Sequence, residues 1–461
     1  MSQPPAAIFA ALPAAVADCI ETHISWVLLA GEFAYKVKKP VTLPFLDYGT
    51  LEMRRACCAA ELRLNRRFAP ALYIEVVDLA GEPAVKMQRF DEAQRLDHVC
   101  RRGELTTEQL TGLARRLFAF QAQAAVASAD TPFGMPATVL ADAQENFEEL
   151  ERLLPQAGVQ LARLKDWTHG EFARHTDVFS KRKADGYIRE GHGDLHLGNL
   201  VLLDGQVIPF DGIEFNEDFR WIDVASEIAF TLLDLLDHGQ PGLATWLLNE
   251  WLARSGDYGA LAVLRFYLVY RAMVRAKVAA LGSDAAEALQ YLAMAEQLAA
   301  PTASTLTITC GLSGCGKTFQ TSRRLAGADF LQTVRIRSDV ERKHLFGLAP
   351  EVASDGSIYT AGATRRTYDR LAELAESTLA AGWSVIVDAA FLKRAERNDF
   401  RALASRLGVP FAILAPVAPP DELARRIASR QNDASEATLA VLAQQLQWFE
   451  PLGADEPTLN L

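Results

Sequence analysis

Cysteine is scarce in this sequence, and long apolar runs are absent. The 461 residues include six cysteines, none of them in a C-x-x-C pair, which argues against a disulfide framework and against a zinc site. The longest oily stretch, 261–278, is interrupted by Arg265, Arg271, Arg275 and Lys277, and the N-terminus lacks the basic segment of a signal peptide. We therefore expect a soluble, cytoplasmic protein without a membrane partner.

An excess of positive charge is also missing. The chain has 47 Lys and Arg against 58 Asp and Glu, a formal net charge of −11, which argues against a general nucleic-acid coat or a binder of anionic membranes. From Ser304 onward the sequence holds 18 basic and 18 acidic residues, so the upstream part carries the whole acidic excess. This asymmetry and the length predict separate domains, about two to four folding units in all.

The upstream part changes pattern once. Up to about residue 100, short β-like runs accompany one helical stretch at 51–68, which indicates a small sheet with a helix. From about residue 105, apolar spacing predicts mostly helix, including 108–127, 142–164 and 225–236. The apolar runs 200–203 and 207–210 flank Asp204 and Gly205, which predicts a β-hairpin.

The first clear linker lies at 300–304, and strand and helix patterns alternate after it. Strands are predicted at 306–310, 333–337, 384–387 and 411–415, and helices from 317 and at 363–381, 395–407 and 421–430. This alternation is typical of a parallel sheet flanked by helices. The fold class is therefore α+β followed by α/β. We expect a domain at 1–302, with a small lobe to about residue 100 and a helical large lobe at 101–302, and a second domain at 303–461.

The segment Gly311–Thr318 is a complete G-x-x-x-x-G-K-[ST] motif between a predicted strand and a predicted helix. Backbone N–H groups of such a loop surround the phosphates of ATP, the lysine reaches the β- and γ-phosphates, and the Thr hydroxyl is a ligand of Mg²⁺. The predicted nucleotide-binding residues are Gly311, Ser313, Gly314, Cys315, Gly316, Lys317 and Thr318, the last also a metal ligand.

Other polar residues of the second domain fit phosphoryl transfer. Asp388 closes a predicted strand, from which a carboxylate reaches the Mg²⁺ shell, although turn or capping duty is an alternative. Asp339 is a candidate base for an acceptor hydroxyl and equally a helix cap. Arg425, Arg426 and Arg430 recur along a late helix, where they either close over the transferred phosphoryl group or form a solvated face.

These motifs give residues 305–455 a resemblance to the small P-loop kinases of the gluconate-kinase and polynucleotide-kinase type, which are AAA-family-ATPase-like. The resemblance implies that Arg337-Ser-Asp339 activates the acceptor, that Asp388 is the acidic strand group, and that Arg425 and Arg430 are lid arginines. Many relatives carry Thr two residues after the strand aspartate, where this sequence has Ala390.

A second set of candidate ligands lies upstream, in His192-Gly-Asp194-Leu-His-Leu-Gly-Asn199 followed by Asp211. Phosphoryl transfer in the kinase fold uses a carboxylate to accept the substrate proton, then an amide and a second carboxylate to hold Mg²⁺. The spacing assigns these roles to Asp194, Asn199 and Asp211. His192 is predicted to brace the loop by a hydrogen bond, and His196 to be structural.

The motif HGDLHxGN, with Asp211-Gly-Ile-Glu214-Phe215, resembles the aminoglycoside phosphotransferase-like branch of the protein-kinase fold over residues 20–298. The resemblance implies a bilobal domain in which Lys36, in Ala34-Tyr-Lys36, binds the α- and β-phosphates and Glu61 is its ion-pair partner. Lys38 has the same side-chain parity on a strand and remains an alternative to Lys36.

Together these features predict an ATP- and Mg²⁺-dependent kinase with two phosphotransferase domains that act on hydroxyl groups of small molecules. One alternative is that only one domain is catalytic and the other is a regulatory ATP-binding module. Another is a C-terminal polynucleotide 5′-hydroxyl kinase, which the balanced charge of that part disfavours. The identity of the acceptor and the oligomeric state do not follow from the sequence.

Overall fold

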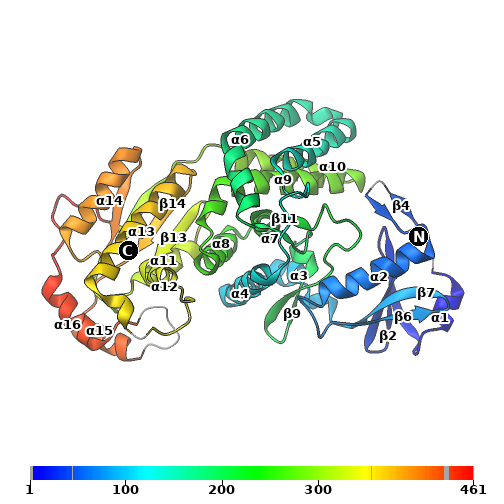
Figure 1. Cartoon of the computed structure of the whole chain (residues 1–461), viewed down its shortest axis with the longest axis horizontal. Coiled ribbons are helices and arrows are strands. Elements are labelled where there is room, and N and C mark those ends of the chain that lie inside the picture. The colour runs from blue at the N-terminus through cyan, green and yellow to red at the C-terminus, as the bar shows by residue number, and fades with distance from the viewer. Residues whose placement is uncertain (1–3, 44, 355, 430–435, 460–461) are drawn as a thin grey trace. The chain divides into compact units, whose positions relative to one another are not determined.

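The computed structural model describes residues 4–43, 45–354, 356–429 and 436–459. The chain divides into two compact units (Figure 1). The first comprises Met1–Asp234 and Tyr270–Ala288, and the second comprises Leu235–Val269 and Leu289–Leu461. None of the helices in the described part of the chain has the length and apolarity that a membrane span requires.

The first unit begins with a five-stranded antiparallel sheet in the order β1-β2-β3-β7-β6. Helix α2 (Leu51–Asn65) contacts β6 and β7, and the Thr50 side chain caps its start by accepting the Met53 N–H. The sheet and α2 confirm the predicted small sheet with a helix, and the bounds of a small lobe stay a prediction. The strands are β1 (Val16–Glu21), β2 (Ser25–Ala30), β3 (Phe33–Lys38), β6 (Tyr73–Leu79) and β7 (Glu82–Gln88), and the short α1 (Ala6–Ala10), β4 (Thr42–Leu43) and β5 (Leu46–Asp47) accompany them.

Helices dominate the chain from α3 to α10, as predicted. One boundary is wrong: the stretch expected as one helix at 142–164 forms two, because Pro155 lacks the N–H that a continuing helix needs. The helices are α3 (Leu96–Arg101), α4 (Thr107–Gln123), α5 (Pro136–Leu153), α6 (Gly158–Ala184), α7 (Val224–Asp237), α8 (Pro241–Ser255), α9 (Leu261–Leu281) and α10 (Ala285–Ala299).

Two short antiparallel pairs interrupt these helices. Strands β9 (Leu200–Leu203) and β10 (Gln206–Pro209) form the predicted hairpin. Its turn residues, Asp204 and Gly205, have φ of 49° and 74°, as a tight two-residue hairpin turn requires. Strand β8 (Ile188–Glu190) pairs with β11 (Trp221–Asp223). The segments between these strands hold the polar loop predicted to carry the first site.

The second unit contains a four-stranded parallel sheet in the order β13-β14-β12-β15. The parallel sheet flanked by helices confirms the predicted α/β fold. The strands are β12 (Leu306–Thr309), β13 (Thr333–Arg337), β14 (Ser384–Asp388) and β15 (Phe411–Leu414), and the helices are α11 (Lys317–Ala326), α12 (Ser338–Leu345), α13 (Ala361–Ala380), α14 (Arg394–Leu407), α15 (Pro420–Ala428) and α16 (Leu439–Trp448).

Helix α8 covers the β13 edge of this sheet. The Asn249 amide donates to the Thr333 carbonyl at 2.9 Å, and its oxygen accepts the Arg335 N–H at 2.5 Å. The side chain thereby satisfies two backbone groups that an edge strand otherwise leaves unpaired. The second compact unit thus starts upstream of residue 302, and the division of the chain into folding domains at 302 stays a prediction.

Candidate active sites

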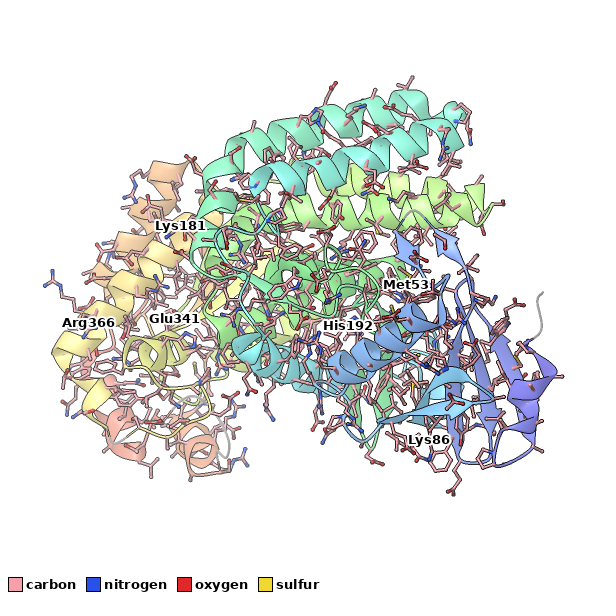
Figure 2. All side chains as sticks on the ribbon, turned by 45° about the vertical axis from the view of Figure 1, so that its right-hand side comes forward. Met53, Lys86, Lys181, His192, Glu341 and Arg366 are labelled. Atoms are coloured by element: carbon pink, nitrogen blue, oxygen red, sulfur yellow. The ribbon has the colours of Figure 1, made fainter. Side chains whose placement is uncertain are left out.

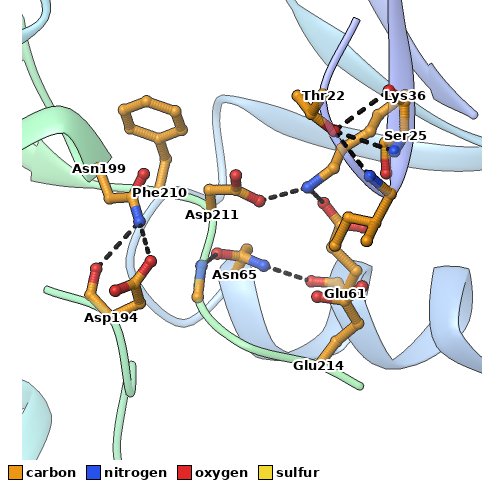
Figure 3. A network of polar contacts seen from close by, with 12 residues as sticks. Thr22, Ser25, Lys36, Glu61, Asn65, Asp194, Asn199, Phe210, Asp211 and Glu214 are labelled. Carbon is orange, nitrogen blue, oxygen red and sulfur yellow. Dashed lines mark hydrogen bonds and ion pairs between the residues drawn. The ribbon is translucent and has the colours of Figure 1, made fainter. Parts of the chain in front are cut away.

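The loop after β8 carries Asp194 and Asn199 in the first unit. The Asn199 Nδ2 group donates to the Asp194 carboxylate at 2.9 Å and to its backbone carbonyl at 3.0 Å (Figure 3). Because the amide nitrogen faces Asp194, the amide oxygen is left for another partner. The loop needs glycine before Asp194: Gly193 has φ of 87°, and a Cβ there would lie 2.6 Å from the Phe219 carbonyl oxygen.

His192 is buried and joins this loop to the hairpin (labelled in Figure 2). Its Nδ1 accepts the Asp194 N–H at 3.3 Å, and its Nε2 lies 2.8 Å from the Phe210 carbonyl oxygen. Since a carbonyl can only accept, Nε2 carries the hydrogen and the ring is neutral. Burial lowers the pKa of His192, in agreement with a neutral ring. These bonds match the predicted bracing role.

Asp211 follows β10 and faces Lys36 of β3. The two side chains form an ion pair and a hydrogen bond (Figure 3), and the Asp211 side chain remains 40% exposed. Asp211 has φ of 61°, a conformation that costs a non-glycine residue about 1–3 kcal/mol unless its surroundings impose it. Here they do: the Asp211 N–H donates to the Tyr73 hydroxyl at 2.9 Å, and the next N–H, of Gly212, donates to the Asn65 amide oxygen at 2.8 Å.

Both predicted lysines reach Glu61, a fully buried residue of α2. Lys38 Nζ donates to Glu61 Oε2 at 2.7 Å. Lys36 Nζ lies 3.0 Å from Oε1, close enough for an ion pair. Yet Oε1 accepts no hydrogen bond from a described residue. Burial acts to raise the pKa of Glu61, but the charges of Lys36 and Lys38 outweigh it and lower that pKa to about 2.

The remaining contacts of the two lysines differ. Lys38 also pairs with Glu214 and donates to the Tyr48 hydroxyl at 3.2 Å, and it is fully buried. Lys36 turns instead towards Asp211, the predicted metal ligand. The spacing of the sequence left both lysines open as nucleotide ligands. The geometry favours Lys36, because only Lys36 shares the partly exposed region with Asp211.

His196 lies beside the Asp194 carboxylate. Its Nε2 lies 3.4 Å from Asp194 Oδ2. Burial acts to lower the pKa of His196, but the Asp194 carboxylate outweighs it and raises that pKa. Burial also acts to raise the pKa of Asp194, but His196 and the charge of Arg271 hold that pKa well below its usual range. An ionised Asp194 can accept a proton from a hydroxyl group.

The residues of the first unit fit a divalent cation and a nucleotide. Asn199 and Asp211 offer an amide oxygen and a partly exposed carboxylate, which are ligands that Mg²⁺ prefers. Lys36 supplies a cation for phosphate oxygens beside them. The chemistry that such a metal supplies is neutralisation of phosphate charge.

The phosphate-loop motif of the second unit lies between β12 and α11. Gly314 and Gly316 have φ of 83° and 97°, and a Cβ on Gly314 would lie 2.8 Å from the Leu423 carbonyl oxygen. The loop therefore requires glycine at these positions. Lys317 Nζ donates to the carbonyls of Gly311 and Leu312 at 2.8 and 2.9 Å. Such a loop before a helix N-terminus suits polyphosphate, with the Thr318 hydroxyl beside it.

Asp388 ends β14 as predicted and is buried. Its Oδ2 accepts the Thr321 hydroxyl at 3.1 Å. Thr321 is one turn after Thr318 on α11, so the carboxylate is held towards the start of that helix. This position suits the predicted metal role. Asp339 lies in the first turn of α12 and is partly exposed, and its roles as base and cap both remain predictions.

The late helix places Arg426 rather than Arg425 against the phosphate loop. Arg426 Nη1 donates to the Gly314 carbonyl at 3.2 Å, whereas the Arg425 side chain is 73% exposed and pairs with Glu422. The lid role of Arg425 stays a prediction, and Arg430 lies outside the described residues. The resemblance singled out Arg425 and Arg430 and left out Arg426, the one arginine of the described pair that contacts the loop.

Gln445 of α16 is a contact that the sequence did not predict. Its Oε1 accepts the Ser313 N–H of the phosphate loop at 2.7 Å. No local motif marks this glutamine, because it reaches the loop from 132 residues away in the chain.

Comparisons with known proteins give a family match for part of the chain and relatives that match most of its length. Residues 306–452 match a family model described as an AAA domain. An uncharacterized protein of Mycobacterium tuberculosis strain H37Rv is 29% identical in an alignment of 451 positions, which covers 94% of this chain and 90% of the relative.

Similar solved structures include the GDP complex of an aminoglycoside 2′-phosphotransferase, at 11% identity and a TM-score of 0.41, covering 62% of this chain and 94% of that one. A choline kinase from Cryptosporidium parvum matches at 10% identity and a TM-score of 0.40, covering 61% of this chain and 88% of that one. The family match falls within the predicted second domain and agrees with the AAA-family-ATPase-like resemblance stated from the sequence.

Proposed function

We propose that this chain is an ATP- and Mg²⁺-dependent phosphotransferase with a nucleotide site in each unit, acting on hydroxyl groups of small molecules. One observation carries the proposal for the first unit: Lys36 from the small sheet meets Asp211 after the hairpin, while Asp194 is held by Asn199. A phosphate ligand, a proton acceptor and two oxygen ligands for a cation thus occur in one unit.

The reaction assigns a role to each of these residues. The acceptor oxygen forms a bond to the γ-phosphorus of ATP as the bond from that phosphorus to the β,γ-bridging oxygen breaks, and ADP leaves. Asp194 takes the hydroxyl proton. Lys36 binds phosphate oxygens, and Asn199 and Asp211 would hold Mg²⁺ against them. Glu61 and Lys38 keep Lys36 in place.

The second unit supports the same reaction class with different residues. Ser313, Gly314, Cys315 and Gly316 direct backbone N–H groups to the phosphates, and Lys317 provides the cation. Thr318 and Asp388 would hold Mg²⁺, and Asp339 is the candidate proton acceptor. Arg426 joins Arg425 as a candidate for closing over the transferred group, because it already touches the loop.

The test is transfer of labelled γ-phosphate to sugars, aminoglycosides and 5′-hydroxyl oligonucleotides. We expect Asp194→Asn and Lys317→Ala each to lose at least 100-fold in kcat towards a different acceptor. Asp177→Asn, which changes an exposed carboxylate of α6, is the matched control and should retain activity.

Other outcomes select the alternatives. If Lys317→Ala only alters the rate of the first activity, the second unit is a regulatory ATP-binding module. Transfer to the oligonucleotide would identify a polynucleotide 5′-hydroxyl kinase. If Asp194→Asn leaves every activity unchanged, the proposal for the first unit fails.

A further inference from the structure

Arg271 of α9 is a buried cation that the proposed machinery does not use. The residue is 6% exposed. Its guanidinium lies 4.8 Å from the centre of the Phe230 ring and 5.4 Å from that of Tyr270. The Nε group donates to the Ser226 carbonyl at 3.2 Å. Two rings and one carbonyl therefore fix the orientation of this side chain.

The two terminal nitrogens of Arg271 have no hydrogen-bond partner among the residues that the structure describes. These two nitrogens are not fully enclosed by protein, unlike the buried side-chain atoms that lack a hydrogen-bond partner. They are therefore accessible to solvent. Burying a guanidinium without a carboxylate at hydrogen-bonding distance is costly. A planar pair of free N–H donors is the arrangement that binds carboxylate or phosphate through two parallel hydrogen bonds.

Arg271 lies close to the proposed base. The Phe230 ring that it covers also packs against His196, with ring centres 5.5 Å apart, and His196 contacts Asp194. In agreement, the charge of Arg271 is one of those that lower the pKa of Asp194. The free guanidinium edge thus belongs to the surroundings in which an acceptor of the first site must bind.

Other charges nearby are paired or differ in sign. Lys277 lies 3.5 Å from Glu145, and Arg275 lies 3.8 Å from Glu287. Asp142 of α5 is exposed to solvent, yet partial desolvation by neighbouring protein, and then the charges of Asp218 and Glu145, raise its pKa to about 6. Of these three described cations, Arg271 alone has no carboxylate at ion-pair distance, and its terminal nitrogens are left for a ligand.

We propose that Arg271 binds an anionic group, a carboxylate or a phosphate, on the hydroxyl acceptor of the first unit. This inference rests on the proposed function and narrows its substrate class to small alcohols that carry such a group. Arg271 is then a specificity residue that holds one end of the acceptor while Asp194 takes the proton from its hydroxyl.

The test uses the full chain carrying Lys317→Ala, so that only the first site transfers phosphate. Four six-carbon acceptors differ in charge: glucose is neutral, open-chain gluconate carries a carboxylate, glucose 6-phosphate a phosphate and glucosamine an amine. Binding is measured by calorimetry in the presence of ADP and Mg²⁺, and transfer is measured with labelled ATP. Inorganic phosphate and acetate serve as minimal anionic probes.

We expect an anionic acceptor to bind most tightly, with gluconate and glucose 6-phosphate distinguishing carboxylate from phosphate. Arg271→Met should weaken binding of the anionic acceptor and raise the KM for that acceptor about 10- to 100-fold. The affinities for ADP and for glucose should change less than threefold. Arg271→Lys should restore part of the loss, because it keeps the charge but not the paired donors. Arg275→Met, on the same helix, is the matched control and should behave as the parent.

Three results overturn the inference. The first is tighter binding of glucose or glucosamine than of either anionic sugar, and the second is no binding of any anion at millimolar concentration. The third is an equal fall in kcat for every acceptor in Arg271→Met without a change in KM, which would make Arg271 a positioning residue for Asp194. Failure of the proposed function is seen separately, because Asp194→Asn would then alter no transfer while the binding measurements still report on Arg271.

Discussion

Replacing Lys36 and Lys38 singly by Met separates a residue needed for nucleotide binding from one needed for stability. Lys38→Met leaves Glu61 and Glu214 without the buried cation that they share. Breaking a buried pair in this way costs about 3–5 kcal/mol. Lys36→Met leaves Glu61 paired with Lys38, and the partly exposed Asp211 can be hydrated, so we expect a cost of about 1 kcal/mol.

Stability and nucleotide affinity are then measured in the full chain carrying Lys317→Ala. In urea unfolding, Lys38→Met should lower the free energy of unfolding by at least 2 kcal/mol more than Lys36→Met does. Binding of a fluorescent ATP analogue at low temperature, where both variants are folded, should weaken at least tenfold in Lys36→Met and less in Lys38→Met.

Equal losses of stability would contradict the inference that Lys38 is the main partner of Glu61. A larger loss of nucleotide affinity in Lys38→Met than in Lys36→Met would assign the phosphate role to Lys38. That outcome would also mean that the contact between Lys36 and Asp211 does not mark the nucleotide site.

Three further changes probe other parts of the chain. Asn249→Leu should lower the free energy of unfolding of the second unit by about 1–3 kcal/mol in urea titrations, because two backbone groups of β13 lose their partner; an unchanged midpoint would show that water replaces the amide. Gly314→Ala should abolish nucleotide binding by the second unit, measured in a Lys36→Met background, since its Cβ meets the Leu423 carbonyl; retained affinity would contradict the strain argument. Asp142→Asn should stabilise the chain above pH 6 by on the order of 1 kcal/mol after discounting for exposure, and leave it unchanged at pH 4. The pKa of this carboxyl is about 6 in the folded chain and about 3.9 when unfolded, so the parent loses stability as pH rises from about 4 to 6; melting temperatures across this range would refute the reasoning if parent and variant stayed parallel.

The second unit was the more predictable part of the fold, for a physical reason. Each buried strand of a parallel sheet is a continuous apolar run, and each crossover helix has its own period, so alternation is visible in the sequence. The first unit gave weaker signals. Strand β1 is largely exposed, so its sequence lacks the apolar pattern by which the neighbouring strands were predicted. In the predicted helix at 142–164, the helical spacing of apolar residues continues across Pro155, although the helix itself ends before it.

The candidate sites were predictable where the chemistry is local in sequence. In two motifs, 192–199 and 311–318, the functional residues are neighbours in sequence. Their relative positions are therefore set by the local backbone. The choice between neighbouring side chains was not local. The preference for Lys36 over Lys38 depends on Asp211 and Glu214, which lie about 175 residues away.

The two candidate sites differ in how their groups are held, and this difference bears on how each binds a nucleotide. In the first unit, bonds from His192, Tyr73 and Asn65 fix the backbone around Asp194 and Asp211 without using the side chains that face a ligand. In the second, the groups that would bind phosphate already bond to protein: Lys317 to loop carbonyls and the Ser313 N–H to Gln445. A phosphate must replace these bonds, and each bond that is lost offsets part of the free energy gained when phosphate binds. Binding in the second unit therefore requires Lys317 and Gln445 to move. In the first unit a ligand must loosen the ion pair between Lys36 and Asp211, but the backbone can stay unchanged.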